Sequence, residues 1–178
     1  MTNFSNQNIT ESIVFDTDSY KVSMAKQYPP GTEYISSYIS SRGGKYDDSV
    51  FFGLQAYLFS VLQRRVTQVE VDFAKKFWEA HGEPFPYEEW TYIVEEYGGR
   101  LPLKVESLDE GTLVPSNVPM VLITNTDPKC FWLTTWVETS MLRAVWYPTT
   151  VASKSFNVRK TIKNYLEKSG DVSGLPFK

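Results

Sequence analysis

Apolar residues in the first half of the chain mostly recur every three or four positions, a spacing that is typical of amphipathic helices. The first predicted helix is short: Asp16 or Asp18 caps it, and Pro29-Pro30 ends it. Three more helices are expected, at residues 50–65, 69–82 and 87–97. Glycines close the last two of them, as helix C-termini often require.

One stretch in this half, residues 33–42, alternates with a period of two and predicts a strand. Tyr34, Tyr38 and Arg42 share one face of this strand, and isoleucines share the other. Arg42 therefore ends the strand beside two tyrosines and against a Gly-Gly turn. Aromatic faces and a fixed guanidinium suit recognition of a flat ring and an anion, although the motif is weak by itself.

Beyond residue 100 the pattern changes to short alternating segments. Residues 101–107, 111–117 and 119–125 each predict a strand, and the turn signals Asp109-Glu110-Gly111 and Ser116-Asn117 separate them. We expect these three segments to form a compact antiparallel β unit.

Two further helices are expected after the β unit. The first, residues 129–148, is apolar on most sides and must be buried, either in a larger core or against another chain. The second, residues 150–168, is basic and amphipathic, with Phe156, Ile162 and Leu166 on its inner face. Together the elements indicate an α+β fold, and no strand follows the last helix to complete an α/β crossover.

Composition narrows the class of protein. The net charge of −3 argues against a general nucleic-acid binder, because no surplus of cations is available to release counterions from phosphates. A single cysteine, Cys130, rules out an internal disulfide framework and fits a reducing compartment. The N-terminus has no signal-peptide pattern, and no apolar stretch reaches the ~20 residues of a membrane-spanning helix. We therefore expect a cytoplasmic protein without a membrane partner.

The residues that could carry chemistry have simple structural interpretations. The sequence contains no Gly-rich phosphate loop, no Cys-x-x-Cys pair and no nucleophile elbow. His81 lies in a last helical turn, which favours a cation, and Cys130 is expected to be a small buried hydrophobe. Lys154, Arg159 and Lys160 could bind phosphate, but a solvated helix face is the simpler interpretation. A self-contained active site is not expected.

The segment FDTDSYKVSMAKQYPP, residues 15–30, resembles the N-terminal segment of the nicotinamide phosphoribosyltransferases. Four later blocks resemble successive parts of the same family in the same order: VFFGLQAYL, YGGRLPLKVESLDEGTLVPSNVPM, NTDPKCFWLTTWVET and VWYPTTVAS. The resemblance covers nearly the whole chain from about Ile13. The short TDSYK motif is shared with nicotinate phosphoribosyltransferases, whereas the NTDP and WYPTTVA blocks favour the nicotinamide branch.

This resemblance implies an enzyme of NAD salvage, which joins nicotinamide to phosphoribosyl pyrophosphate and gives nicotinamide mononucleotide and pyrophosphate. It also implies Mg²⁺ on the pyrophosphate and an active site at a homodimer interface, where the N-terminal segment of one subunit completes the site of the other. Carried over by residue, Tyr20 matches a tyrosine that stacks on nicotinamide, and Asp18 matches an acidic residue close to that ring. Arg42 matches an arginine that helps to bind the phosphates.

The resemblance further implies the N-terminal domain of a type II phosphoribosyltransferase, ending at the start of an incomplete α/β barrel. The expected division is a disordered arm at residues 1–12, an N-terminal α+β domain at 13–148 and the first helix of a truncated barrel at 149–178. Members of the family are much longer. The catalytic residues are therefore expected beyond Lys178, and the 178-residue chain is expected to be inactive alone.

Two other interpretations stay open. The chain could be a non-catalytic docking or binding module for a separate catalytic chain. It could also belong to a nicotinate phosphoribosyltransferase. The carboxylate of nicotinate would then want an additional cation near Tyr20, and Lys21 is the only one adjacent.

Overall fold

The computed structural model describes residues 12–177, and its strands form two antiparallel sheets. The larger sheet has the order β1 (Ser36–Ser40), β5 (Pro119–Asn125), β3 (Leu103–Ser107). The smaller sheet pairs β2 (Asp48–Val50) with β4 (Leu113–Pro115). The β unit predicted at 101–125 is therefore divided between two sheets, because its middle strand pairs with β2 and its last strand also pairs with β1.

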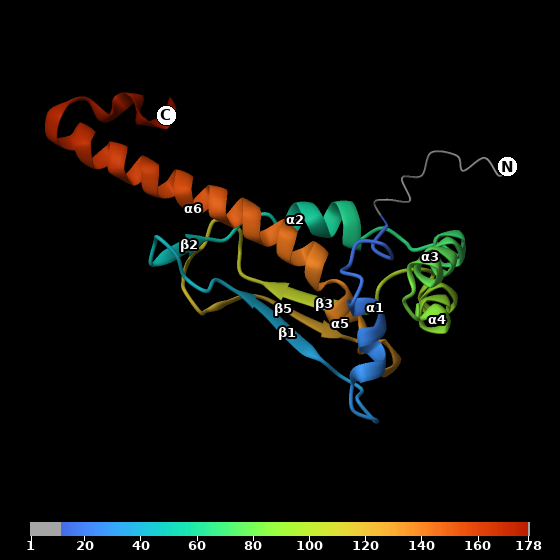
Figure 1. Cartoon of the computed structure of the whole chain (residues 1–178). Coiled ribbons are helices and arrows are strands. Elements are labelled where there is room, and N and C mark those ends of the chain that lie inside the picture. The colour runs from blue at the N-terminus through green and yellow to red at the C-terminus, as the bar shows by residue number, and fades with distance from the viewer. Residues whose placement is uncertain (1–11, 178) are drawn as a thin grey trace.

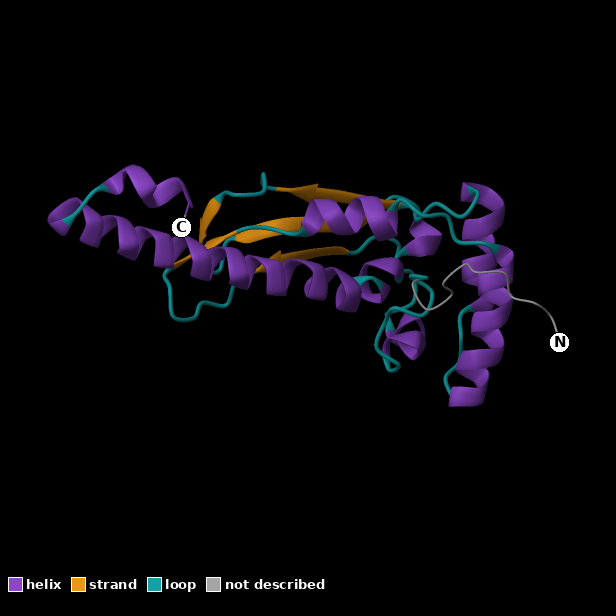
Figure 2. Cartoon of the chain, turned by 90° about the horizontal axis from the view of Figure 1, so that it is seen from above, coloured by secondary structure: helices purple, strands orange, loops and turns teal. Residues whose placement is uncertain are grey.

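A long helix, α6 (Glu138–Ser169), crosses over the larger sheet and continues beyond it (Figure 1). The helices α3 (Gln68–His81) and α4 (Tyr87–Tyr97) pack together at the other end of the molecule and run across the direction of α6 (Figure 2). Short helical elements join these parts: α1 (Lys21–Met24), η2 (Ala25–Gln27), α2 (Leu54–Tyr57), the π-helix η3 (Leu58–Leu62), η4 (Pro128–Cys130) and α5 (Leu133–Trp136). A further short helix, η5 (Val172–Phe177), follows α6.

The helices predicted at 69–82 and 87–97 are confirmed as α3 and α4. They could be predicted because residues close in the sequence determine where each helix begins or ends. The Thr67 hydroxyl accepts a hydrogen bond from the Glu70 N–H while the Glu70 carboxylate accepts one from the Thr67 N–H, which forms a capping box at the start of α3. Gly82 ends α3 in the left-handed conformation, with φ of 93°. Gly98 ends α4 in the same way.

The helix predicted at residues 50–65 is partly wrong, because its first residues belong to a strand. Val50 is the last residue of β2, and the helical part covers only 54–62. The Val50 N–H donates to Ser153 Oγ at 2.8 Å, and the Phe51 N–H donates to the Thr112 carbonyl at 3.0 Å. The N–H groups of Val50 and Phe51 therefore bond to residues far away in the sequence and not within a helix, although the local apolar spacing predicts a helix here.

The two helices predicted on either side of Pro148 form one continuous helix, α6. Buried hydroxyl groups just past the proline hold α6 to the strand segment: Thr149 Oγ1 accepts from the Phe52 N–H, and Ser153 accepts from Val50. Phe156, which was expected on an inner face, is 43% exposed, so this part of the prediction is wrong. The proposed domain boundary at 148/149 falls inside α6, and the division into domains stays a prediction.

Most of the apolar segment predicted at 129–148 packs within the chain's own core, but Trp146 and Tyr147 near its end are exposed, so the prediction that it is buried is only partly correct. The indole rings of Trp90, Trp132 and Trp136 pack edge to face, with centroids 5.1–5.6 Å apart. The indole N–H of Trp136 donates to the Ile13 carbonyl at 2.8 Å, which ties the N-terminal segment to the core. Nearly all of the predicted disordered arm, residues 1–12, lies outside the described residues.

Candidate functional site

The segment before α1 is attached to α5 and α6 by side-chain hydrogen bonds. The Thr17 hydroxyl donates to the Trp136 carbonyl at 2.9 Å, and the Thr139 hydroxyl donates to Asp18 Oδ2 at 2.6 Å. Asp16 forms an ion pair with Arg143. Three successive polar residues of this segment therefore meet partners more than 115 positions away in the sequence.

The prediction that Asp16 or Asp18 caps the first helix is wrong. Helix α1 begins at Lys21, and Tyr20 occupies the N-cap position without a side-chain hydrogen bond to the helix. Asp18 contributes its backbone carbonyl to the Lys21 N–H at 2.9 Å, while its side chain turns to Thr139. The local sequence predicts that an aspartate caps the helix, but the Asp18 carboxylate instead accepts a hydrogen bond from the Thr139 hydroxyl on α6.

Lys21, the cation that the sequence places next to Tyr20, has a partner that the sequence did not indicate. Its side chain is 2% exposed, and its ammonium forms an ion pair with Glu138, whose side chain is 49% exposed. A buried ammonium needs such a partner because it has lost its hydration. The two residues lie 117 positions apart, so no local signal could have paired them.

Tyr20 stands between these anchors with most of its ring in solvent. It is 58% exposed, and the Lys21 ammonium lies 5.5 Å from the centroid of its ring. Asp18 is fixed two residues before Tyr20 and Lys21 one residue after it. The backbone is thereby held on both sides while the ring projects outward.

A groove of about 530 Å³ opens between β1 and the start of α5 and α6, a volume within the range of small-molecule sites. Arg42 and Glu138 bring opposite charges to it. The exposed Arg42 guanidinium makes no hydrogen bond or ion pair with any residue of the described chain, so it is available to an anion. Hydroxyl and apolar side chains complete the lining: Ser36, Ser37, Tyr38, Ile39, Ser40, Ile123, Thr134, Thr135, Met141 and Leu142.

The structure brings the three predicted site residues only partly together. Tyr20 and Asp18 neighbour each other before α1, which lies beside α5 (Figure 1). Arg42 follows the far end of β1, which leads away from α1 towards β2 (Figure 1). Glu138 links the two places, because it lines the groove with Arg42 and pairs with Lys21 beside Tyr20.

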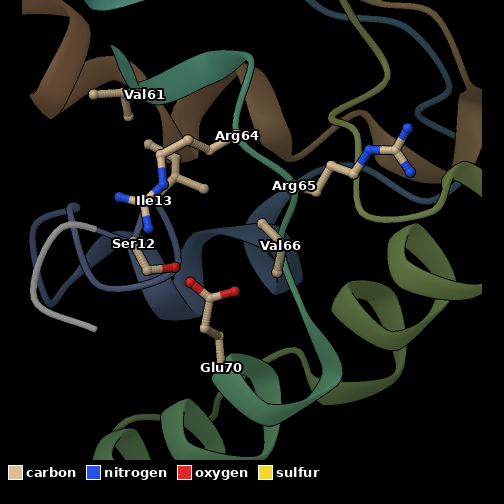
Figure 3. Close-up of a pocket in the computed structure, with 7 residues that line it drawn as sticks. All are labelled: Ser12, Ile13, Val61, Arg64, Arg65, Val66 and Glu70. Atoms are coloured by element: carbon tan, nitrogen blue, oxygen red, sulfur yellow. The ribbon is translucent and has the colours of Figure 1, made fainter. Parts of the chain in front are cut away.

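A second cavity lies between the N-terminal segment and α3, but it is too small for a substrate. Figure 3 shows Ser12, Ile13 and Glu70 at this cavity, with the side chain of Arg65 pointing away from them. Its volume is about 10 Å³, which is room for roughly one water molecule.

The other candidate residues keep their structural interpretations. Cys130 is buried, and this burial raises the pKa of its thiol to about 12, so it behaves as a small hydrophobe. The His81 ring stacks on Phe77 at 6.3 Å between centroids. The basic residues of α6 between 154 and 160 are exposed.

Among residues 12–177 no cluster of three or more His, Cys, Asp or Glu side chains is placed to hold a metal ion. In that same range, no helix is both long and apolar enough to cross a bilayer.

Comparison with known proteins identifies related sequences over most of the chain. The family model "Nicotinamide phosphoribosyltransferase, N-terminal domain" matches residues 12–105. A nicotinamide phosphoribosyltransferase of Xanthomonas campestris pv. campestris (strain 8004) is 43% identical over 170 residues, 94% of this chain and 36% of that protein. Another, of Acinetobacter baylyi (strain ATCC 33305 / BD413 / ADP1), is 30% identical over 171 residues, 86% of this chain and 34% of that protein. The chain thus spans about a third of the length of these relatives.

A solved structure supports the fold. The crystal structure of human nicotinic acid phosphoribosyltransferase superposes with a TM-score of 0.60 and 21% sequence identity, over 80% of this chain and 28% of that one. At this identity the likeness concerns the fold alone, and it agrees with the predicted α+β N-terminal domain. The family model covers more than half of the 178 residues, and the resemblance drawn from the sequence motifs is confirmed. The chain therefore belongs to the nicotinamide phosphoribosyltransferase family and carries its N-terminal domain.

Proposed function

We propose that the protein takes part in the transfer of a phosphoribosyl group from phosphoribosyl pyrophosphate to nicotinamide, which gives nicotinamide mononucleotide and pyrophosphate in NAD salvage. Family membership supports the reaction class. Within it, Tyr20 stacks on the nicotinamide ring, Asp18 lies close to that ring, and Arg42 binds phosphate oxygens.

The burial of Lys21 and its ion pair with Glu138 favour nicotinamide over nicotinate as the substrate. Nicotinate carries a carboxylate, and Lys21 is the cation adjacent to Tyr20 that could meet it. The Lys21 ammonium is instead 2% exposed and paired with Glu138. A second carboxylate at this place would face a cation that is already neutralised, whereas the uncharged amide of nicotinamide has no such requirement.

The proposed chemistry is displacement at the anomeric carbon of the ribose. The ring nitrogen of nicotinamide forms a bond to this carbon as the bond to pyrophosphate breaks, through an oxocarbenium-like transition state. Arg42 offers fixed positive charge to the phosphate oxygens, on which negative charge develops. We propose that Mg²⁺ enters with phosphoribosyl pyrophosphate, bound to its oxygens, where it would help to neutralise the departing charge.

We further propose that the site is composite and lies at a homodimer interface. Tyr20 is exposed and faces outward, which suits a ligand held by a second subunit. The remaining catalytic residues would come from outside residues 12–177. A cytoplasmic location is proposed from the single, buried cysteine, which fits a reducing compartment.

The test is an assay of nicotinamide mononucleotide formation by the complete gene product, with nicotinamide or nicotinate, phosphoribosyl pyrophosphate and Mg²⁺. We expect turnover, with kcat/KM at least about tenfold higher for nicotinamide, because a buried unpaired charge costs more than ~1.4 kcal/mol. The 178-residue chain, assayed beside it, is expected to be inactive. A preference for nicotinate would contradict the substrate assignment, and absence of turnover by the complete gene product would favour the docking module.

A further inference from the structure

We propose that Lys21 and Glu138 are positioning residues, which fix the place of the Tyr20 ring for nicotinamide. This inference rests on the proposed function, since it assumes that Tyr20 binds the ring. It adds a role for an ion pair that itself contacts no substrate in the proposed mechanism.

The first argument is the direction in which Lys21 points. Its neighbours Ser19 and Tyr20 are exposed, yet the Lys21 side chain is 2% exposed and reaches the first residue of α6. Helix α1 is four residues long and has no side-chain cap, so it has little stability of its own. Its position therefore depends on tertiary contacts, which include the burial of Val22 in the core and the ion pair of Lys21 with α6.

The second argument is the arrangement of those links around Tyr20. Two consecutive residues of α6, Glu138 and Thr139, contact Lys21 and Asp18 respectively. These contacts lie on either side of Tyr20 in the sequence, which restrains the backbone from both directions. The Lys21 ammonium also lies 5.5 Å from the centroid of the Tyr20 ring, within the range of a cation–π contact. The ion pair thus restrains the Tyr20 ring as well as the backbone next to it.

The third argument is the place of Glu138 in the fold. A carboxylate in the first turn of a helix is stabilised by the helix dipole, so α6 holds Glu138 as a fixed anchor. Glu138 also lines the groove that contains Arg42. The same residue therefore sets the position of the ring-binding segment relative to the groove.

Steady-state kinetics of the complete gene product test the proposal with Lys21→Met, Glu138→Gln and the double variant. We expect Lys21→Met to raise KM for nicotinamide about tenfold while kcat and KM for phosphoribosyl pyrophosphate stay within about twofold. Glu138→Gln, which keeps a hydrogen-bond acceptor, should have a smaller effect. Because the residues act as a pair, the double variant should match Lys21→Met rather than multiply the two effects.

Lys163→Met is the matched control, because it breaks an exposed Lys–Glu pair with Glu167 on the outer half of α6. It should leave all kinetic constants unchanged. Melting temperatures separate positioning from general loss of structure: a fall in kcat and in Tm, together with a similar rise in both KM values, would overturn the proposal for Lys21→Met. If Lys21→Met does not fold, Glu138→Gln carries the same test, since its side chain is half exposed.

Failure of this inference differs from failure of the proposed function. If the unsubstituted protein forms no nicotinamide mononucleotide, both are overturned. If it is active and Tyr20→Ala raises KM for nicotinamide while Lys21→Met does not, the positioning role alone is overturned.

Discussion

At the scale of single residues, Tyr20 combines an exposed ring with an anchored backbone. The ring is 58% exposed, and Asp18 and Lys21 on either side of it are bound to α6. An exposed aromatic side chain contributes little to the core, so its removal should affect a ligand more than the fold.

We therefore expect Tyr20→Ala to raise KM for nicotinamide at least about fivefold, which corresponds to the ~1 kcal/mol or more of a ring–ring contact. Tyr20→Phe, which keeps the ring, should remain close to the unsubstituted protein. Kinetics of the complete gene product and its melting temperature check both statements. Unchanged nicotinamide kinetics in Tyr20→Ala would contradict the stacking role.

The hydrogen bonds of Asp127 lead to a second prediction, which concerns how the stability of the fold depends on pH. Its carboxylate accepts hydrogen bonds from the Tyr97 hydroxyl at 2.5 Å, the Lys129 N–H at 2.7 Å and the Tyr92 hydroxyl at 2.9 Å. The bond from Tyr97 is the largest cause that lowers the pKa of Asp127 below its ordinary value of 3.8. This carboxylate joins the segment after β5 to α4.

The lowered pKa fixes the sign of the pH dependence. The charged carboxylate stabilises the folded chain at pH values above its unfolded pKa, and this contribution is lost as pH falls through the lower folded pKa. We expect the free energy of unfolding to fall below about pH 4, and to fall less steeply in Asp127→Asn, which is also less stable at pH 7. Chemical denaturation at several pH values measures this. If the free energy of unfolding fell equally steeply with pH in the two proteins, other carboxylates would dominate the loss of stability in acid, and the prediction for Asp127 would be wrong.

The sequence predicts single residues well where local chemistry decides. Burial of Cys130 followed from its apolar neighbours, and it is confirmed. The partners of Asp18 and Lys21 could not be predicted, because both lie on α6, more than 115 positions away. A capping aspartate and an aspartate bound to a distant hydroxyl look the same in the sequence.

At the scale of elements, α6 packs closely at its internal proline against a glycine from another part of the chain. Pro148 has no N–H to donate to the Ala144 carbonyl, which would be its helical partner. Gly53 packs at this point, and a Cβ added to it would lie 2.4 Å from the Ala144 oxygen and 2.7 Å from the Pro148 ring. The φ of Gly53 is 106°, so both its backbone and its packing require glycine.

Gly53→Ala is therefore expected to destabilise the protein more than Gly82→Ala. Gly82 also has positive φ, at 93°, but an added Cβ would meet nothing within 4 Å. Gly82→Ala should cost about 1 kcal/mol from backbone strain, and Gly53→Ala a further ~1–3 kcal/mol from overpacking. The comparison uses the free energy of unfolding in denaturant. Equal losses would contradict the close packing of Gly53 on α6.

Element types were predictable where their signals are local. Helices α3 and α4 carry their own start or stop residues, Thr67 with Glu70 and the glycines at 82 and 98. Strand partners were not predictable, since β4 pairs with β2 and β5 with β1 across more than 60 positions. A proline inside an apolar stretch normally indicates a break, but α6 continues through Pro148, next to its contacts with Gly53 and Phe52.

At the scale of the whole molecule, exposed aromatic side chains fit the proposed subunit interface. Tyr38, Phe59, Trp146 and Tyr147 are each 64–68% exposed in addition to Tyr20. Aromatic residues are enriched at protein interfaces because they bury a large area.

If Tyr20 and Arg42 of one subunit serve the same composite site, mixing two variants should not restore activity. In a mixed dimer of Tyr20→Ala and Arg42→Ala subunits, one site would lack the ring and the other the guanidinium. We expect such dimers, isolated through two different affinity tags after co-expression, to be no more active than the mean of the two parent variants. If the two residues instead served different sites, one site of every mixed dimer would be intact, and activity would return to about half that of the unsubstituted dimer. A protein that is monomeric and fully active would contradict the composite site itself, because no second subunit would then be present to complete it.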